Sequence, residues 1–572
     1  MRSQIKLHIL LLIAFSFSVS AHSQSIPDAQ KILAQRGEVY FQFVPADFEV
    51  LDQIARVISV DEYDPQTGIA TAYANKQGFE RFLSFKLDFE LLNAPGLAAH
   101  KSQFNMLNEV DVSTIDAWDF YPTYEAYESM MEQFEELFPH LYERIEILTL
   151  PSGRKLIFGR ITADVEEENE RPKFMYTSTM HGDETTGFNL MLRMIHYLLN
   201  GYGEDDEITW LLDNLEIWIC PNENPDGTYT TNNNTITGAT RGNASFIDLN
   251  RNYPNPVLVP EPDMQSETEA MIQLVQSYPF VLSANIHGGI ECVNYPWDSW
   301  KSWEKTHADH YWWQYVMHEY ADTARYYSPS GYMDPWGPSF NNGVTHGGDW
   351  YVIYGSRQDY MNYYAHLREF TLEISNTKLL PTSQLNDLWN YNYRSLLNYM
   401  KQSLFGIRGR VTDALTGEPV VARIHLTGYD THNSHVYSHA VHGIFNRPLK
   451  EGTYDLLVSA DGYPDKFIPG IEVLNHHTTW LDIEMGIEAS IVIVDQGKVV
   501  LFPNPAGDRF TLQNLTGNEY IRVLDLSGKV IKEKNASSTS AVIPVVSLAP
   551  SLYIVEIRSS HQTIRKKLQV IR

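Results

Sequence analysis

Two histidines and one glutamate stand where strands of a buried sheet are expected to end, and these residue types can hold a metal ion. His181 and Glu184, in the string His-Gly-Asp-Glu, follow the strand-like run 173–179, and His287 ends the apolar run 281–287. A catalytic zinc commonly takes two His and one Glu and leaves its fourth position to water. A single His-x-x-Glu is frequent in any long chain, so the prediction of a zinc site depends on both runs ending at one sheet edge.

A loop rich in arginine and asparagine, residues 241–252, predicts an anion site. Arg241 and Arg251 have no matching Glu in this loop, and a guanidinium suits planar, bidentate capture of a carboxylate. Asp248 is a candidate partner for the second nitrogen of a metal-binding His, because such His residues usually donate to a carboxylate. A surface loop of turn-forming residues is the alternative interpretation of this segment.

Glu373 lies in the middle of an apolar strand-like run, 370–374. A carboxylate in such a place is costly unless it has a function or a partner. Burial raises the pKa of a carboxylate and a neighbouring metal lowers it. This combination suits a general base.

The elements that must position these residues alternate between strands and helices from residue 115 to 403. Residues 173–179 read as a strand, and the runs 215–220 and 281–287 are continuous and apolar, as in strands buried on both faces. Residues 184–199 have the period of an amphipathic helix. Loops rich in Asn, Gly and Pro, residues 222–262, follow strand ends, where open α/β sheets place their sites. We therefore expect an α/β catalytic domain.

The rest of the chain predicts four smaller parts. Residues 25–110 have the order β-α-β-β-α, which suits a small α+β sandwich. Short alternating strands with turns predict two all-β sandwich modules, at 406–485 and 496–572. Residues 1–24 have a positive start, a short apolar run and a small-residue cleavage site, as in a signal peptide. No later run is long enough to span a bilayer, so we expect no transmembrane segment in the mature chain.

The composition is globular and acidic. Hydrophobic residues make up 43% and charged residues 20% of the chain, which argues against disorder. The formal net charge of -28 argues against nucleic acid or an anionic membrane as the main partner. An acidic soluble surface and a cationic substrate both fit this charge. Two cysteines, Cys220 and Cys292, are too few for a disulfide scaffold, and the sequence leaves their pairing open.

Residues 115–403 resemble the zinc carboxypeptidase (funnelin) family, in particular its carboxypeptidase D/N/E branch. The matching strings occur in the order that the family has. They are HGDE (181–184), NPDG (224–227), the block 241–252, NIHGG (285–289) with NYP (294–296), QDY (358–360) and FTLEIS (370–375).

The resemblance implies a fold, a cofactor and residue roles. The fold is a central mixed sheet of the eight-stranded type flanked by helices, and the cofactor is one Zn²⁺ per catalytic domain. His181, Glu184 and His287 match the zinc ligands. The other matched positions are Arg241 for polarising the scissile carbonyl, Glu373 for the general base, Asn250 and Arg251 for binding the terminal carboxylate, and Tyr360 for the mobile tyrosine that closes over the substrate.

The flanking parts also resemble known modules. Residues 406–485 resemble the transthyretin-like β-sandwich that follows the catalytic domain in the D/N/E branch. Residues 496–572 resemble the C-terminal sorting domain of type IX secretion substrates. This implies export by an outer-membrane secretion machinery to the exterior or surface of a Gram-negative bacterium. Residues 25–110 occupy the position of the family's inhibitory prosegment.

The expected function is zinc-dependent removal of the C-terminal residue from peptides or proteins. Two alternatives are an amidase of the same fold acting on peptidoglycan stem peptides, and a catalytically weak surface-binding protein. Arg251 disfavours the first and Glu373 with Arg241 disfavours the second. The D/N/E resemblance implies a preference for C-terminal Lys or Arg. Glu291 or Asp298 is a candidate to line the pocket for such a residue, and a surface loop is the alternative.

Overall fold

The computed structural model describes residues 26–98, 101–258, 261–335, 337–486, 499–559 and 563–572. The chain forms two compact units, Met1–Gly486 and Ile487–Arg572. The signal peptide predicted at 1–24 lies outside the described residues. Among the described residues, no helix has the length and apolar character needed to cross a bilayer.

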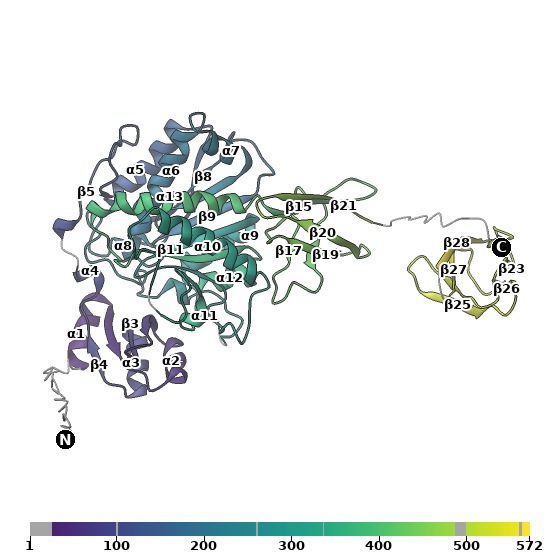
Figure 1. The fold of residues 1–572 in the computed structure, drawn as a ribbon, viewed down its shortest axis with the longest axis horizontal. Coiled ribbons are helices and arrows are strands. Elements are labelled where there is room, and N and C mark those ends of the chain that lie inside the picture. The colour runs from purple at the N-terminus through teal and green to yellow at the C-terminus, as the bar shows by residue number, and fades with distance from the viewer. Residues whose placement is uncertain (1–25, 99–100, 259–260, 336, 487–498, 560–562) are drawn as a thin grey trace, which may run out of the picture. The chain divides into compact units, whose positions relative to one another are not determined.

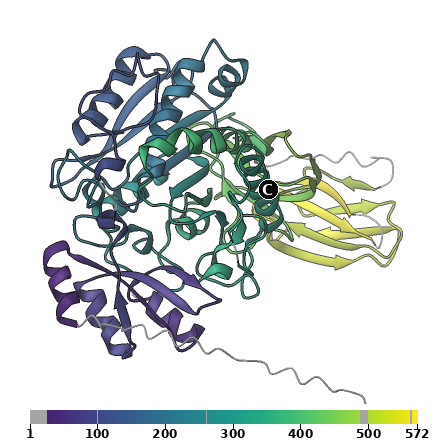
Figure 2. The ribbon, with the colours of Figure 1, turned by 60° about the vertical axis from the view of Figure 1, so that its left-hand side comes forward.

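The first part of the chain, drawn in purple in Figures 1 and 2, is a four-stranded antiparallel sheet with helices on one face. The period of two along β1 explains this arrangement. Val39, Phe41 and Phe43 pack against the helices, whereas Tyr40 points to the opposite face beside Tyr73. The sheet order is β2-β3-β1-β4. The elements are α1 Ile26–Arg36, β1 Glu38–Phe43, α2 Phe48–Ala55, β2 Ser59–Asp64, β3 Ile69–Asn75, α3 Lys76–Phe82, β4 Phe89–Leu91 and α4 Pro95–Ala98.

The second part is an α/β domain built on an eight-stranded mixed sheet of order β13-β12-β14-β11-β9-β10-β8-β7. The four central strands β14, β11, β9 and β10 run parallel to one another. The prediction of a central mixed eight-stranded sheet flanked by helices is confirmed. The strands are β7 Tyr142–Thr149, β8 Lys155–Ile161, β9 Lys173–Ser178, β10 Glu216–Cys220, β11 Phe280–His287, β12 Glu291–Tyr295, β13 Val344–His346 and β14 Arg368–Ile374.

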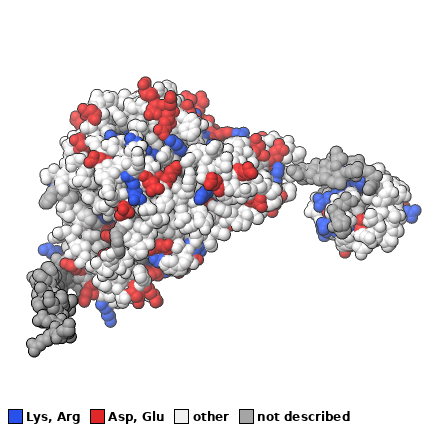
Figure 3. All heavy atoms as spheres, in the orientation of Figure 1, with Lys and Arg blue, Asp and Glu red and all other residues white. Residues whose placement is uncertain are grey.

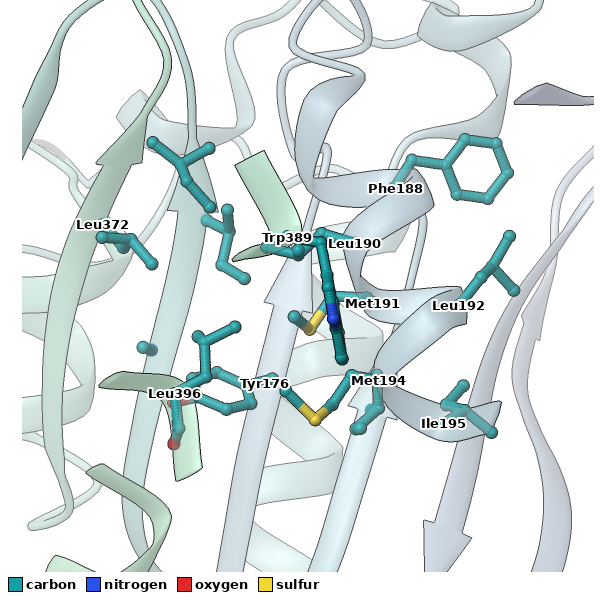
Figure 4. Close-up of a cluster of buried hydrophobic side chains, with 14 of the residues drawn as sticks. Tyr176, Phe188, Leu190, Met191, Leu192, Met194, Ile195, Leu372, Trp389 and Leu396 are labelled. Atoms are coloured by element: carbon teal, nitrogen blue, oxygen red, sulfur yellow. Dashed lines mark hydrogen bonds between the residues drawn. The ribbon is translucent and has the colours of Figure 1, made fainter. Parts of the chain in front are cut away.

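Helices cover both faces of this sheet. One face packs against α5, α6, α10 and α13, and Figure 4 shows α6 side chains such as Met191 and Met194 meeting Tyr176 of the sheet. The other face packs against α9 and α12. The helices are α5 Tyr124–Leu137, α6 Thr186–Gly201, α7 Asp206–Asn214, α8 Pro225–Thr228, α9 Ser266–Ser277, α10 His310–Tyr326, α11 Gly347–Trp350, α12 Arg357–Tyr363 and α13 Leu385–Gln402; β5 Met106–Leu107 pairs with β6 Tyr121–Pro122.

A β-sandwich follows α13 directly. Its two sheets have the orders β18-β15-β21 and β17-β16-β19-β20. A buried network of two arginines and two aspartates joins it to the α/β domain: Arg447 of the sandwich contacts Asp309 and Asp430, and Asp309 also accepts from Arg368. The strands are β15 Gly406–Asp413, β16 Arg423–Leu426, β17 Val436–Tyr437, β18 Ile444–Arg447, β19 Gly452–Ser459, β20 Lys466–Val473 and β21 Thr478–Met485.

The second compact unit is a separate β-sandwich with its own core. Its sheets have the orders β22-β23-β26 and β25-β24-β27-β28. The space-filling view shows Lys and Arg side chains on the drawn face of this unit (Figure 3). The strands are β22 Val500–Phe502, β23 Arg509–Gln513, β24 Tyr520–Leu524, β25 Val530–Asn535, β26 Ser540–Pro544, β27 Ser551–Arg558 and β28 Thr563–Val570.

Candidate active site

The three predicted metal ligands meet at the carboxyl-terminal edge of the central sheet. His181 and Glu184 lie between β9 and α6, and His287 is the last residue of β11, the parallel neighbour of β9. His181 Nδ1 and His287 Nδ1 are 3.0 Å apart. Glu184 Oε2 lies 3.0 Å from the first nitrogen and 2.8 Å from the second. We call these three buried residues the His-Glu-His cluster.

Close backbone packing holds the loop that carries His181. A Cβ atom at Gly182 would lie 2.2 Å from the backbone carbon of Gly227, so only glycine fits. Gly227 belongs to the turn that opens α8, where Asn224 Oδ1 accepts from its N–H at 2.9 Å. The Asn224 side-chain amide also donates to Met180 O at 3.1 Å. The 224–227 turn therefore packs against Met180 and Gly182, the two neighbours of His181, and holds His181 in place.

Asp248 connects the His-Glu-His cluster to the arginine loop. Its Oδ1 lies 2.9 Å from His181 Nε2, and its Oδ2 accepts from Arg241 Nε at 3.0 Å. A carboxylate on the second nitrogen fixes the orientation of an imidazole and raises its strength as a ligand. One buried aspartate thus positions both a histidine and an arginine.

Asn250 and Arg251 lie in a short 3₁₀ turn, Leu249–Arg251, and both line the cavity that contains the cluster. The Asn250 side-chain oxygen accepts from the backbone N–H of Arg357 at 2.9 Å. Arg251 Nη1 donates to the backbone oxygen of Asn250 at 2.9 Å. With Arg241, this brings two guanidinium groups into one cavity of about 470 Å³.

Glu373 faces the same cavity from β14. The register of the parallel pair β11 and β14 places it directly opposite His287. Its side chain is partly exposed, toward the cavity. Burial, and then the nearby charge of Glu184, raise the pKa of Glu373 to about 8.

The structure does not bring Tyr360 to the cavity. Its ring packs between those of Tyr253 and Tyr364, each with centroids 5.5 Å away, on the opposite side of the sheet from α6. Tyr351 lines the cavity instead. Tyr351 lies in the irregular segment after α11, where no periodic pattern could have indicated it.

Of the two acidic residues considered for specificity, Asp298 lines the cavity and Glu291 does not. Asp298 is buried, and its Oδ1 accepts from Asn294 Nδ2 at 3.2 Å and from Gln358 Nε2 at 3.0 Å. Burial raises the pKa of Asp298. Glu291 begins β12 and accepts from the backbone N–H of Asn376 at 3.4 Å.

Comparisons with known proteins agree with this geometry. Residues 127–395 match the family model described as zinc carboxypeptidase. Carboxypeptidase E from Caenorhabditis elegans is 31% identical over 388 residues, which cover 60% of this chain and 82% of that protein. The chain belongs to the zinc carboxypeptidase family.

Other relatives share smaller parts with the chain. Human carboxypeptidase D is 32% identical over 59% of this chain, and the chain spans only 25% of that protein's length. A solved carboxypeptidase A from Helicoverpa armigera has a TM-score of 0.49 and 16% identity, over 64% of this chain and 97% of that one. Residues 500–571 match a secretion system C-terminal sorting domain.

The His-Glu-His cluster fits the zinc ion that the carboxypeptidase family implies. The two facing imidazole nitrogens and Glu184 Oε2 lie within 3.0 Å of one another. A bound cation would offset the repulsion between their lone pairs. Burial lowers the pKa of His287 to about 4, so this imidazole is neutral, as a ligand must be.

The N-terminal domain supplies residues to the cavity that the sequence patterns did not indicate. Asp61 Oδ1 accepts from Arg241 Nη1 at 2.9 Å and from Lys378 Nζ at 2.6 Å. The backbone oxygen of Val60 accepts from Arg251 Nη2 at 2.9 Å, and that of Asp61 from Tyr351 Oη at 3.0 Å. These contacts join residues distant in the chain, so no local pattern could have indicated them.

The two cysteines of the chain are both buried and free. Cys220 ends β10 and Cys292 lies in β12. Neither lines the cavity. The open question of their pairing is thus answered: they do not form a disulfide.

Proposed function

We propose that the protein is a secreted zinc carboxypeptidase that removes one residue at a time from the C-terminus of peptides or proteins. One observation carries the proposal: the His-Glu-His cluster, Glu373 and the pair Asn250 and Arg251 line one cavity. A zinc hydrolase needs the first two features. The third adds the recognition of a free carboxylate.

Arg251 and Asn250 would bind the substrate's terminal carboxylate. A guanidinium forms bidentate hydrogen bonds with a carboxylate, and the amide nitrogen of Asn250 provides a further donor. An internal peptide bond offers no carboxylate at this position. The same two residues therefore explain why only the last residue would be removed.

Three groups of the chain would act on the scissile bond. A zinc ion bound by His181, Glu184 and His287 would make water acidic and polarise the carbonyl oxygen. Glu373 would accept the proton of the attacking water at its carboxylate and pass it to the leaving amine. Arg241 would donate hydrogen bonds to the oxygen on which negative charge develops. Asp248 holds Arg241 and His181 in place.

Asp298 supports a preference for C-terminal Lys or Arg. It is buried beside two amide donors, and no Lys or Arg among the described residues forms an ion pair with it; the charge of Arg251 lowers its pKa by less than burial raises it. A buried carboxylate without a cationic partner is costly. The side chain of a terminal Lys or Arg would supply the missing charge.

The N-terminal domain would act as a prosegment. Strand β2 places Val60 and Asp61 against Arg251, Tyr351 and Arg241, three residues that the substrate would use. A substrate must displace these contacts to bind. We propose that the domain lowers the activity of the full chain by competing with the substrate for these three residues.

The C-terminal unit would direct export. Its match to a secretion system sorting domain supports delivery to the exterior or surface of a bacterium. We propose that the bacterium is Gram-negative and that the partner is its outer-membrane secretion machinery. Removal of residues 499–572 would then retain the enzyme inside the cell.

The test is hydrolysis of N-blocked dipeptides ending in Arg, Leu or Glu by the purified protein, with and without a chelator. We expect release of the terminal residue, fastest for Arg, and loss of activity with chelator that zinc restores. The matched control is the same peptide with a C-terminal carboxamide, which should resist cleavage. Chelator-resistant hydrolysis, or no hydrolysis after release of the N-terminal domain, would contradict the proposal. Cleavage of the carboxamide would favour the amidase.

A further inference from the structure

Two carboxylates and two cations alternate around one point of the cavity. Asp61 Oδ1 accepts from Arg241 Nη1 at 2.9 Å and from Lys378 Nζ at 2.6 Å. Glu184 Oε1 accepts from the same two nitrogens, each at 3.1 Å. The oxygen of Glu184 that faces the histidines is the other one, Oε2. Lys378 thus lies next to the His-Glu-His cluster without blocking it.

The structure holds Lys378 firmly in this position. Its side chain is only 7% exposed. Its backbone oxygen accepts from the N–H of Thr185 at 3.0 Å. Its Cε packs on Gly289, where a Cβ atom would lie 3.3 Å away, and its ammonium lies 5.0 Å from the centre of the Tyr73 ring. These contacts fix the position of the Lys378 ammonium at the wall of the cavity.

One of the two carboxylates belongs to the N-terminal domain and not to the catalytic domain. Without Asp61, Arg241 keeps Asp248 Oδ2 and Glu184 Oε1, whereas Lys378 keeps Glu184 Oε1 as its one ion pair among the described residues. A buried ammonium that shares its one carboxylate oxygen with a guanidinium leaves a position that favours an anion. Asp61 shows which chemistry this position accepts, because a carboxylate fills it in this structure.

The anion position lies about one residue away from the proposed carboxylate clamp. Arg251 contacts the backbone oxygen of Val60, and Lys378 contacts the side chain of the next residue, Asp61. Both residues belong to strand β2, where a register shift leaves Asp61 as the extra residue between Val60 and Glu62, and neighbouring Cα atoms are about 3.8 Å apart. A peptide with its last residue at Arg251 would bring its preceding residue near Lys378.

We infer that Lys378 and Arg241 form a subsite for an acidic side chain on the residue that precedes the scissile bond. The preferred substrates are then peptides that end in Asp or Glu followed by the residue that is removed. This inference rests on the proposed function, which defines where the last residue binds. It makes Lys378 a residue that determines specificity.

The test measures binding, so that it does not depend on turnover. The zinc-loaded full chain carries Asp61→Ala, which empties the anion position, and Glu373→Gln, which prevents hydrolysis. Calorimetry compares its affinities for N-blocked Asp-Arg and Ala-Arg. We expect Asp-Arg to bind about tenfold more tightly, as a charge-assisted hydrogen bond provides. Equal affinities, or no binding of either peptide, would overturn the inference.

Variants of Lys378 identify the residue responsible. Adding Lys378→Met should weaken binding of Asp-Arg about tenfold and so remove the difference between the peptides, whereas Lys378→Arg should retain part of it. Lys155→Met is the matched control, because Lys155 pairs with Glu128 and Glu146 outside the cavity, and it should retain the full difference. Circular dichroism and melting curves identify a misfolded variant, for which Lys378→Arg then decides the question.

Two results separate this inference from the proposed function. If Lys378→Met weakens both peptides equally, Lys378 acts on a feature common to them, and the acidic subsite is wrong. If Asp-Arg binds more tightly but the chain with Glu373 intact hydrolyses neither peptide, the subsite stands and the proposed hydrolysis fails.

Discussion

Two glutamates of the cavity have the same chemistry and different surroundings. Glu184 contacts two histidines, Arg241 and Lys378, so its negative charge is well compensated. Glu373 has no ion pair among the described residues, and burial raises its pKa to about 8. A carboxyl group with a high pKa can carry a proton between water and a leaving group near neutral pH. The surroundings therefore support the proposed roles, which are ligation for Glu184 and proton transfer for Glu373.

Replacing Glu373 tests this division of roles. Glu373→Gln retains the shape of the side chain but removes its ability to accept a proton. We expect kcat to fall about a thousandfold with little change in KM, because general base catalysis contributes on this order. Bound zinc, measured by atomic absorption, should be unchanged. A loss of zinc from this variant would place Glu373 among the ligands and contradict the assignment.

Mutating Asp298 and Glu291 in turn tests which of them determines the preference for a C-terminal Arg. Asp298 lines the cavity and Glu291 does not. Asp298→Asn should lower kcat/KM for a C-terminal Arg substrate on the order of tenfold to a hundredfold relative to Leu, because the charged partner is lost. Glu291→Ala should leave the ratio of Arg to Leu unchanged. The reverse pattern would move the specificity pocket to the start of β12.

Single residues differed in how far the sequence could locate them. His181 and Glu184 follow one strand-like run and His287 ends another, so their convergence followed from the parallel order of the two strands. Tyr351 lies in an irregular segment, and the string that suggested Tyr360 belongs to a helix facing away from the cavity. Lys378 contacts Asp61 across 317 positions of the chain. Contacts of that kind depend on how two domains pack, which no local pattern encodes.

Elements with a strong period were predicted well. The expected helix at 184–199 corresponds to α6, Thr186–Gly201, and the expected apolar strand at 281–287 corresponds to β11, Phe280–His287. Weak elements were missed: β13 has only three residues, and the edge strand β7 is mostly half-buried, which weakens its alternation. These elements form by pairing with neighbours already in place.

Strand β2 tests the role of the N-terminal domain as a prosegment. Asp61→Ala removes the contacts with Arg241 and Lys378, so the covering domain should be held less tightly. We expect the activity of the full chain on an N-blocked dipeptide to rise about tenfold, since charge-assisted hydrogen bonds are lost. Asp64→Ala, at the end of the same strand, is the matched control, because Asp64 bonds only within its own turn. Equal activity of both variants and the unchanged chain would show that β2 does not restrict access.

At the scale of the whole molecule, the α/β domain and its β-sandwich depend on one buried charge network. Arg447 contacts Asp309 and Asp430, and the side chains of all three are at most 1% exposed. Removing one member of such a network leaves an uncompensated buried charge. Arg447→Met should lower the free energy of unfolding by about 3–5 kcal/mol, measured with urea and tryptophan fluorescence. Adding Asp309→Asn should restore part of the loss, and additive losses would contradict a shared network.

The C-terminal unit should respond to acid separately, through Glu556. The Glu556 side chain is only 1% exposed, and it accepts from Arg522, Arg558 and Arg565. Burial alone would raise its pKa, but the hydrogen bonds from these arginines outweigh burial and lower the pKa to about 2. A pKa lowered on folding stabilises the fold above the ordinary value of 4.5, and this stabilisation is lost as the pH falls toward 2.

We therefore expect the unfolding transition of the C-terminal unit to depend on the charge of Glu556. None of the chain's 12 tryptophans lies beyond Trp480, so tryptophan fluorescence follows the first unit and calorimetry adds the second. Glu556→Gln should destabilise the calorimetric transition by about 2 kcal/mol at pH 6, less than the full shift implies because the Arg558 and Arg565 side chains are 48% and 65% exposed. At pH 2.5 this difference should shrink to about a quarter, because Glu556 is then almost fully protonated in the unfolded chain and partly protonated in the folded unit. A difference that persists undiminished at low pH would mean that the glutamate stabilises the unit by its shape and not by its charge.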